Sequence, residues 1–427
     1  MKIIIATLGT RGDVQPFVAL GKGLIAAGHQ VVLATCEHFE PFIRAHGLEY
    51  GYVNNELIEF LHSEDGKIAM ENSANLRETI ATAIRLGPKL GAMVRRQMDD
   101  MWAACEQHAP DLVIYHPKVA GAADFAEKLG VPCILAFYLP MFAPTSEFPV
   151  ARFPEWPLGG WYNRFTYRLV RGAFRLVSGR VKRWRTQHGL AARSPALKLQ
   201  LPDGRPIPIL QAYSPLVIPQ PSDWPDWAQA TGFWFLDEQQ DWTPPKELVD
   251  FLNDGPPPVY FGFGSIFGRS PQRVAELILQ AVQQTGVRAI LLRGWGGLEP
   301  PARALGDNVL FIDSAPHDWL FTRMRAVVHH GGCGTTAAAL RAGKPQIICP
   351  FFGDQPFWGN VVAKLGVGPP PIAQRRLTAE RLSTAIQQTM DNPTMHAKAA
   401  ELGDRIRQEH GVAEAVAFVN QWYDKLR

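Results

Sequence analysis

A glycine-rich turn between histidine and threonine is the part of this sequence best suited to bind an anion. Residues 330–336 read His-Gly-Gly-Cys-Gly-Thr-Thr, after an apolar run at 326–328 and before an alanine-rich run at 337–340. These runs predict a buried strand before the turn and a helix after it. The N-terminus of a helix offers unpaired N–H groups and the positive end of the helix dipole. We therefore expect this turn to hold a phosphate or diphosphate.

An acid and an amide stand side by side after the next predicted strand. Asp354 and Gln355 follow the apolar run 346–350. In open α/β sheets the carboxyl ends of parallel strands form the edge where ligands bind. A carboxylate and an amide at that edge suit the hydroxyl groups of a sugar. The alternative interpretation is a tight turn with an exposed acid beyond it.

The elements that must position these residues follow a repeating order. Residues 2–8, 14–28 and 31–35 predict strand, helix and strand, and the same order recurs from residue 259 to residue 292. Such βαβ units require a parallel sheet in each half of the chain. The turn after the first strand of each half lacks the GxGxxG spacing, which makes a dinucleotide-dependent dehydrogenase the least favoured function.

Length and composition limit the number of domains and the class of protein. A chain of 427 residues suits two domains of roughly 200 residues each. Five cysteines with no CxxC pair fit reduced thiols in a cytoplasmic protein, and the N-terminus shows neither a signal peptide nor a membrane span. There is no Asp-x-Asp motif and no His/Cys cluster with metal-ligand spacing, so we expect no metal site.

The motif at 330–336, together with Gly-Asp-Gln-Pro-Phe-Trp-Gly at 353–359, resembles the donor-binding signature of nucleotide-sugar-dependent glycosyltransferases of the UDP-glycosyltransferase family. The branch it most resembles holds sterol glucosyltransferases and the glycopeptide and macrolide antibiotic glycosyltransferases. The resemblance implies an α/β protein with two Rossmann-like domains facing across a cleft, the GT-B fold. It also implies an inverting, metal-independent transfer with no cofactor, because the nucleotide sugar is a co-substrate.

The resemblance and the proline-rich segments suggest a division of the chain. We expect an N-terminal acceptor-binding domain at 1–218, a semi-rigid linker at 219–256, and a C-terminal nucleotide-sugar-binding domain at 257–405. A last helix at 406–427 is expected to return to the N-terminal domain.

Two residues of the first half are candidates for catalysis. In the enzymes that this chain resembles, the loop after the first strand supplies a general base, and the matching residue here is Asp13. Such a base takes the proton of the acceptor hydroxyl as its oxygen attacks the anomeric carbon. The alternative for Asp13 is a helix N-cap. His116, the last residue of a strand predicted at 111–116, could pair with Asp13 or merely satisfy the backbone.

The resemblance also assigns residues to the donor and the acceptor. Those expected to hold the diphosphate are Ser265, His330, Gly332, Gly334 and Thr335, with Asp354 and Gln355 on the sugar. The nucleobase is assigned to Trp295, Ser314 and Ala315, and a tryptophan common in relatives is replaced by Ser314, which leaves uracil and thymine open. The proline-rich loop at 138–149 is expected to wall an apolar acceptor through Phe142, Thr145 and Phe148, its alternative being an ordinary surface loop.

A basic amphipathic helix is predicted within residues 161–185. No acidic residue occurs between Glu155 and Asp203, where ten arginines and lysines lie. Apolar residues from Tyr167 to Trp184 recur at steps of three and four, beside a stripe of arginines that ends at Arg185. Two interpretations stay open: a domain helix with its apolar stripe in the core, or a peripheral contact with the inner, anionic face of a membrane. Nucleic acid is not expected as a partner.

Taken together, the sequence predicts transfer of a hexose, glucose first, from a UDP- or dTDP-sugar to a hydroxyl of an apolar acceptor such as a sterol, terpenoid, macrolide or lipid. A sugar-nucleotide epimerase or hydrolase of the same fold is the competing enzyme. A non-catalytic nucleotide-sugar-binding protein is the competing class.

Overall fold

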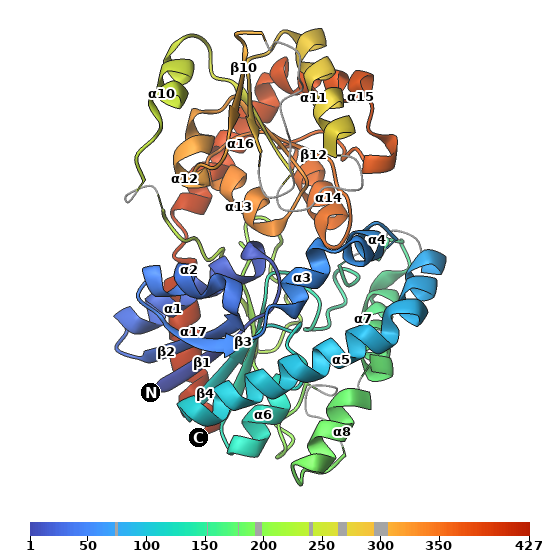
Figure 1. The fold of residues 1–427 in the computed structure, drawn as a ribbon, viewed down its shortest axis with the longest axis vertical. Helices are drawn as coiled ribbons and strands as arrows, with labels where there is room; N and C mark the ends of the chain where they lie inside the picture. Colours follow the sequence, from blue (N-terminus) through green and yellow to red (C-terminus); the bar gives the residue numbers. More distant parts are fainter. Residues whose placement is uncertain are drawn as a thin grey trace. The chain divides into compact units, whose positions relative to one another are not determined.

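The computed structural model forms two compact units, each built on its own sheet (Figure 1). The first unit holds residues 1–66, 80–236 and 410–427, and the second holds residues 67–79 and 237–409. The structure describes residues 1–72, 76–151, 153–177, 179–192, 199–238, 242–263, 271–293 and 306–427.

The sheet of the first unit has seven strands in the order β3-β2-β1-β4-β5-β6-β7, and neighbouring strands pair in parallel. The strands are β1 Lys2–Ala6, β2 Gln30–Cys36, β3 Glu49–Val53, β4 Leu112–Tyr115, β5 Cys133–Phe137, β6 Ile209–Gln211 and β7 Ala228–Ala230. The apolar run Ile3, Ile4 and Ile5 has no exposed surface. A strand covered by helices on both faces requires such a continuous apolar run.

The helices of this unit come from both the N-terminal and the C-terminal parts of the chain. They are α1 Arg11–Ala26, α2 Glu40–Ala45, α3 Glu56–His62, α4 Glu64–Asn72, α5 Leu76–His108, α6 Ala122–Leu129, α7 Gly159–Val177, α8 Gly179–Gln187 and α17 Gly411–Leu426, with α4 and α5 running into or out of residues 67–79. Helix α17 packs on α1 so closely that a Cβ atom on Gly23 would lie 2.3 Å from a methyl of Val412. The last helix therefore belongs to the first unit.

The second unit has a five-stranded sheet in the order β10-β9-β8-β11-β12, again with parallel neighbours. Its strands are β8 Val259–Gly262, β9 Ala289–Leu292, β10 Val309–Ile312, β11 Ala326–His329 and β12 Gln346–Ile348. Its helices are α10 Lys246–Asn253, α11 Pro271–Thr285, α12 His317–Leu320, α13 Cys333–Arg341, α14 Gln355–Leu365, α15 Ala379–Met390 and α16 Pro393–Arg407. Strands β8 and β11 each contribute to two cores, one on each face of the sheet. Phe261 of β8 and Val328 of β11 pack in one core, and their neighbours Tyr260 and Val327 pack in the other.

The segment expected as a linker, 219–256, contains regular structure at both ends. Strand β7 is the edge strand of the first sheet, and α10 lies in the second unit. The chain passes from one unit to the other between Leu236 and Asp237. In the parts of the chain that the structure describes, no helix has the length and apolar character needed to cross a membrane.

The basic stripe predicted for 161–185 is wrong at its last member. Arg185 is 1% exposed, and its guanidinium lies 2.7 Å from both a carboxylate oxygen of Asp124 and one of Glu127, two residues of α6. A buried guanidinium needs such partners, because leaving a charge unpaired in the interior is costly. Arg185 thus joins α8 to α6 instead of facing water.

We expect Arg185→Ala to destabilise the first unit by about 3–5 kcal/mol, because it leaves the Asp124 carboxylate buried without its partner. Chemical denaturation followed by circular dichroism would measure the loss. The control is Arg183→Ala, since Arg183 is exposed on the same helix and should change stability by no more than about 0.5 kcal/mol. Equal losses in the two variants would contradict a structural role for the Arg185 pairs.

Candidate active site

The carboxylate of Asp13 is fixed by the turn that precedes α1. The helix begins at Arg11 with Thr10 as its N-cap, so Asp13 is its third residue. The Thr10 N–H donates to Oδ2 of Asp13 over 2.8 Å, and the Thr7 hydroxyl donates to the Asp13 backbone carbonyl. This is one half of a capping box, in which an acidic third residue satisfies the N-cap N–H. The alternative of Asp13 as the helix N-cap is wrong, because Thr10 is the N-cap and Asp13 is the third residue of the helix. Its contacts with Thr10 involve only one of its two oxygens.

The close approach of backbone to carboxylate depends on Gly9. Its φ is +143°, a region that side chains disfavour, and a Cβ atom there would lie 2.0 Å from Asp13 Oδ2. Only a residue without a side chain lets the turn pass over the carboxylate at this distance.

The other oxygen, Oδ1, meets side chains from two neighbouring strands. Lys118 Nζ lies 2.6 Å from it, and the Tyr138 hydroxyl donates to it over 2.9 Å. His116 Nε2 lies 3.8 Å from the same oxygen. His116 directly follows β4 and Tyr138 directly follows β5, while the Asp13 turn follows β1. Because β1, β4 and β5 are adjacent parallel strands, their carboxyl ends bring these residues to one edge of the sheet.

His116 is a neutral, buried imidazole. It has no exposed surface, and burial lowers its pKa to about 3 despite the opposing pull of the Asp13 charge. Its Nδ1 accepts the Lys118 backbone N–H over 3.2 Å. An acceptor nitrogen carries no hydrogen in neutral imidazole, so we assign the proton to Nε2. That N–H has no hydrogen-bond partner among the described residues, and the nearest carboxylate is Asp13.

The carboxylate of Asp13 stays charged although it is buried. Burial acts to raise its pKa, but the charge and hydrogen bond of Lys118 and the Thr10 N–H more than offset burial, so the pKa of Asp13 lies below its usual value. Asp13 is thus ionised at neutral pH. Lys118 and Tyr138 were not among the catalytic residues predicted from the sequence. The only available signal was their position, since each is a polar residue shortly after a buried strand, β4 or β5.

The glycine-rich turn of the second unit lies between β11 and α13. Gly331 has φ +90°, and a Cβ atom there would lie 2.6 Å from Ile348. A Cβ atom on Gly332, the N-cap of α13, would lie 2.5 Å from His330 Nε2. The glycines are therefore required both for the turn and for the position of the His330 ring. Burial lowers the pKa of His330 to about 4, against a hydrogen bond with the Gly262 backbone, so this ring is neutral at pH 7.

The other residues predicted to bind the donor near this turn differ in how exposed they are. Gly334 is exposed and Thr335 is half-buried, whereas the hydroxyl of the next residue, Thr336, donates to the Gly332 carbonyl. Ser314 is exposed and Ala315 half-buried just after β10, at the same edge of the sheet. Ser265 and Trp295 lie outside the described residues.

Asp354 and Gln355, which follow β12, both make hydrogen bonds within their own loop or to the helix that follows it. Gln355 is buried, and its side-chain carbonyl accepts the N–H groups of Phe351 and Phe352 over 2.7 and 3.2 Å. Asp354 is the N-cap of α14, and its Oδ2 accepts the indole N–H of Trp358 over 3.1 Å. These contacts hold the loop in place. A sugar-binding role for the two residues stays a prediction.

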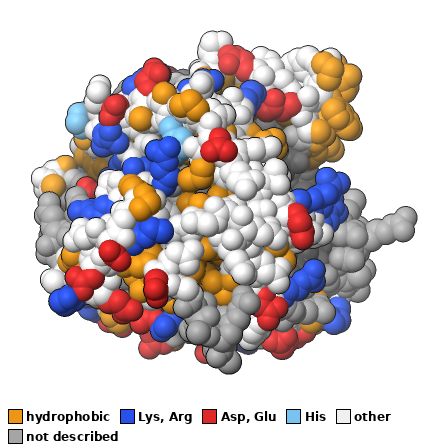
Figure 2. Space-filling view, turned by 90° about the horizontal axis from the view of Figure 1, so that it is seen from above, with side chains coloured by type: hydrophobic (Ala, Val, Ile, Leu, Met, Phe, Trp, Pro, Cys, Tyr) orange, Lys and Arg blue, Asp and Glu red, His pale blue; other side chains and the backbone are white. Residues whose placement is uncertain are grey.

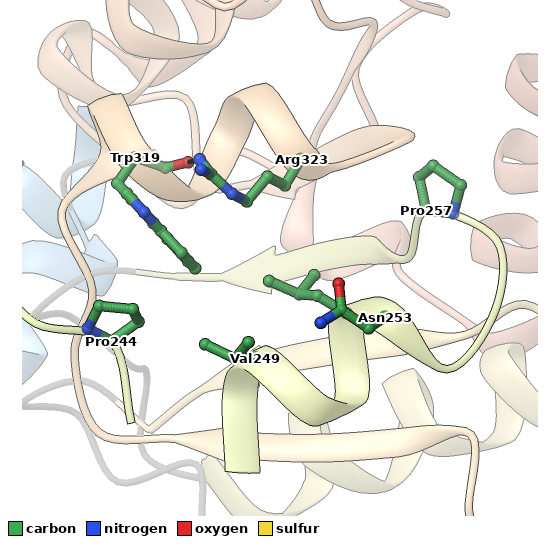
Figure 3. Close-up of a pocket in the computed structure, with 7 residues that line it drawn as sticks. Pro244, Val249, Asn253, Pro257, Trp319 and Arg323 are labelled. Carbon is green, nitrogen blue, oxygen red and sulfur yellow. Dashed lines mark hydrogen bonds between the residues drawn. The ribbon is translucent and has the colours of Figure 1, made fainter. Parts of the chain in front are cut away.

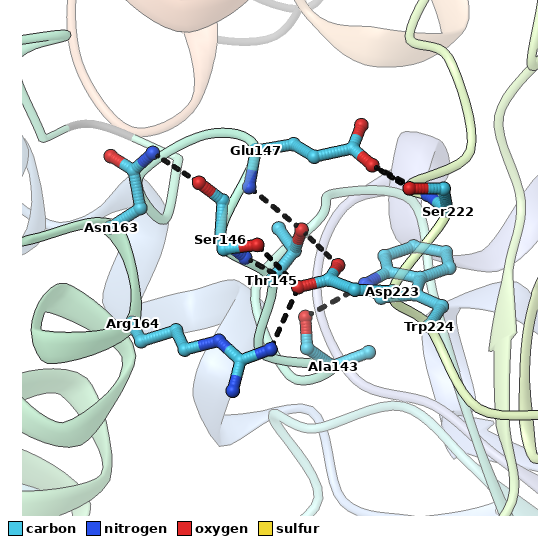
Figure 4. A network of polar contacts seen from close by, with 9 residues as sticks. All are labelled: Ala143, Thr145, Ser146, Glu147, Asn163, Arg164, Ser222, Asp223 and Trp224. Carbon is cyan, nitrogen blue, oxygen red and sulfur yellow. Dashed lines mark hydrogen bonds and ion pairs between the residues drawn. The ribbon is translucent and has the colours of Figure 1, made fainter. Parts of the chain in front are cut away.

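The carboxylate of Asp223 holds the loop at 138–149 in place through hydrogen bonds (Figure 4). This is the loop expected to line the acceptor site. Thr145 has no exposed surface, and its hydroxyl donates to Asp223 Oδ1; the Ser146 N–H and hydroxyl and Arg164 bind Oδ2. Burial acts to raise the pKa of Asp223, but the hydrogen bonds of Thr145 and Ser146 and the pairing with Arg164 hold it well below its usual range.

The two phenylalanines predicted for this loop differ in exposure. Phe142 is buried against Phe137, and Phe148 is half-buried. Acceptor binding by Phe142, Thr145 and Phe148 stays a prediction, and the structure gives Thr145 a fastening role.

A hollow of about 560 Å³ lies elsewhere in the second unit (Figure 3). Its lining residues are Pro244, Val249, Leu252, Asn253, Pro257, Trp319 and Arg323. The Arg323 guanidinium stacks on the Trp319 ring at 4.0 Å, and none of the residues predicted for donor or acceptor lines the hollow. It therefore adds nothing to the site described above.

Two family models match the chain. Residues 3–147 match the glycosyltransferase family 28 N-terminal domain, and residues 295–419 match the C-terminal domain of erythromycin biosynthesis protein CIII-like proteins. The calicheamicin glycosyltransferase CalG4 has a TM-score of 0.70 at 18% identity, covering 100% of this chain and 98% of its own. Glycosyltransferase VinC, solved in complex with dTDP, has a TM-score of 0.67 at 19% identity, covering 100% of both chains. The chain has the GT-B fold of these glycosyltransferases. The predicted α/β fold with two Rossmann-like domains is confirmed.

Among curated relatives of this chain are fungal sterol 3-beta-glucosyltransferases. The protein of Emericella nidulans is 40% identical over 435 residues, and that of Aspergillus fumigatus is 39% identical over 431 residues. Each alignment covers 98% of this chain but 30% of the relative. The chain thus spans less than a third of the length of these relatives. In the described part of the chain, no group of three or more His, Cys, Asp or Glu side chains could hold a metal ion.

We expect Gly9→Ala to displace the Asp13 carboxylate and to lower the rate of glycosyl transfer by about a hundredfold, the order that a 1 Å misplacement costs. Steady-state kinetics would measure the loss. The matched control is Gly28→Ala, because Gly28 also has positive φ, +87°, but a Cβ atom there meets nothing within 4 Å. It should lose about 1 kcal/mol of stability and no activity. A similar loss of rate in both variants would point to backbone strain alone.

We expect Lys118→Met to move the acid limb of the kcat/KM profile to higher pH. A general base works only when deprotonated, and Lys118 lowers the pKa of Asp13, so its removal raises that pKa and protonates the base at a higher pH. Lys118→Arg, which keeps the charge, serves as the control. An acid limb that stays in place in Lys118→Met would show that Asp13 does not govern it.

Proposed function

We propose that this chain transfers a hexose, with glucose as the first candidate, from a UDP- or dTDP-sugar to a hydroxyl of an apolar acceptor, with inversion and without a metal. The observation that carries the proposal is the Asp13 carboxylate, which is buried yet ionised at the carboxyl edge of three parallel strands. It rests also on the glycine turn of the second unit, whose helix N-terminus suits a diphosphate.

Asp13 acts in this proposal as the general base. A carboxylate has about four lone-pair positions. Lys118 and Tyr138 contact Oδ1, and the Thr10 N–H and hydroxyl contact Oδ2. The acceptor hydroxyl therefore displaces Lys118, whose side chain is half exposed and reaches the site from the surface. The proton passes to Asp13 as the hydroxyl oxygen bonds to the anomeric carbon, and the nucleoside diphosphate leaves with the electron pair of the broken bond. Pairing of His116 with Asp13 in the reaction requires the ring to move closer, because His116 Nε2 lies 3.8 Å from Oδ1, beyond hydrogen-bond distance.

The donor is held in the second unit. The N–H groups at the start of α13, with His330 and Thr335, bind the diphosphate and stabilise its leaving-group charge. Asp354 and Gln355 bind the sugar, and Ser265 belongs to the diphosphate site through the family resemblance alone. Both UDP and dTDP are retained as donors, because curated relatives at about 40% identity are named glucosyltransferases and VinC was solved with dTDP.

The acceptor class follows from the names of the relatives. Those at about 40% identity are sterol 3-beta-glucosyltransferases, so a sterol 3-hydroxyl is the first acceptor to try. Macrolides and other apolar alcohols come next.

The test is release of UDP from UDP-glucose, with dTDP-glucose in parallel and EDTA present, over a panel of sterols, macrolides, flavonoids and hydroxy fatty acids. We expect acceptor-dependent release that falls by about 10²–10⁴-fold in Asp13→Asn, which removes the base. Asp111→Asn is the matched control, because Asp111 precedes β4 at the opposite edge of the sheet and accepts the Lys2 N–H.

Each other outcome assigns a different function. Release without acceptor would indicate a hydrolase, and a changed sugar on intact UDP would indicate an epimerase. Binding of UDP-glucose without any turnover, unchanged in Asp13→Asn, would indicate a non-catalytic binding protein.

A further inference from the structure

Exposed hydrophobic side chains gather on one short stretch of the first unit. Seven large hydrophobic residues are exposed among those that the structure describes, and five of them lie between residues 156 and 169. We call these five the α7 ridge: Trp156, Leu158, Trp161, Phe165 and Leu169. Trp161 is 67% exposed. A contiguous apolar patch of this kind on a folded protein marks a contact surface more often than a chance exposure.

The ridge follows the periodicity of helix α7. Trp161, Phe165 and Leu169 are spaced four residues apart, which places them on one face. The opposite face is buried through Tyr167 and Thr166, which have 1% and 0% exposure. The stripe that the sequence analysis singled out therefore begins in the core at Tyr167, as one of its two interpretations held. The exposed ridge is a second stripe that it did not recognise.

Helix α7 is held firmly beneath the ridge. The Thr166 hydroxyl accepts the Val150 N–H over 2.9 Å, and the Asn163 side chain donates to the Ser146 carbonyl over 2.8 Å. Arg164 pairs with Asp223, the centre of the network in Figure 4. The Trp156 ring stacks on Tyr162 with centroids 5.5 Å apart. These contacts fix α7 in the native fold with the side chains of the ridge exposed to solvent.

From Trp156 to the end of α8, all the charged residues of the chain are positive. Arg164 and Arg168 each lie three residues after a ridge position, and both are exposed. Helix α8, which contacts α7, adds the exposed Lys182 and Arg183. Residues 156–202 hold ten arginines and lysines and no acid, although the whole chain carries only +3. The molecular face in Figure 2, by comparison, shows both signs of charge interspersed.

We propose that the α7 ridge attaches the protein to the surface of an anionic lipid bilayer. Aromatic and leucine side chains on one face of a helix, with arginines beside them, are the pattern of a helix that lies in the membrane interface. Tryptophan favours that interface because its ring is apolar and its N–H is polar. Anionic headgroups attract the neighbouring cations. A second copy of this chain fits less well, because symmetric pairing would set the same arginines against one another.

The test uses sedimentation with vesicles of phosphatidylcholine, with or without phosphatidylserine, in the absence of donor and acceptor. We expect binding to the serine-containing vesicles that weakens at high salt. The double variant Trp161→Ser, Phe165→Ser should bind at least tenfold more weakly. Arg168→Glu should lose at least fivefold, about the effect of one cation near such a surface. The matched controls are Ile25→Ser with Tyr52→Ser, and Lys22→Glu, which alter exposed residues elsewhere in the unit.

Three results would overturn the proposal. Wild-type protein could fail to sediment with either vesicle. The ridge variant could bind as well as its control. Size-exclusion chromatography could show a wild-type oligomer that the ridge variant abolishes, which would assign the ridge to self-association. Denaturation midpoints equal to wild type show that the variants are folded. Because no substrate is present, failure here leaves the proposed transferase activity standing, and failure of transfer leaves this test unaffected.

Discussion

The structure of the first unit depends on keeping one carboxylate charged where water barely reaches it. Asp13 is 4% exposed, and an ionised group in such a place is tolerated only when charge and hydrogen bonds replace its hydration. The replacements come from three places in the sequence: Thr10 before α1, Lys118 after β4, and Tyr138 after β5. The strand order β1-β4-β5 is what brings them together, and Gly9 is what lets the backbone approach. The strand order, the glycine at position 9 and the three donor residues are all needed because this acid is buried.

The parts of the site that the sequence could predict are those set by local rules. Apolar runs mark buried strands and glycines mark the turns after them, so the edge position of Asp13, His116 and His330 followed from chain order alone. Lys118 and Tyr138 could not be chosen in this way. Their contact with Asp13 depends on which strands are neighbours and on how each side chain turns, and neither is encoded in the spacing of residues.

Helix α7 shows a related limit of periodicity. A repeat of three and four residues predicts a helix with two unlike faces, but α7 carries two apolar stripes, and only packing decides which is covered. Tyr167 is covered and Trp161 is not. Arg185 shows the same limit for charge, since its carboxylate partners lie on α6, about sixty residues earlier in the sequence. Long-range contacts of this kind decide whether a basic residue is surface or core.

The two units handle charge in opposite ways. In the first, a lysine holds a buried acid ionised. In the second, residues 330–336 contain no lysine or arginine, and burial lowers the pKa of His330 to about 4. In the proposed reaction, a diphosphate on this turn therefore first meets backbone N–H groups and a neutral imidazole. Its negative charge then raises the pKa of His330, because an opposite charge nearby favours the protonated ring. In the proposed reaction, donor binding and protonation of His330 therefore favour each other.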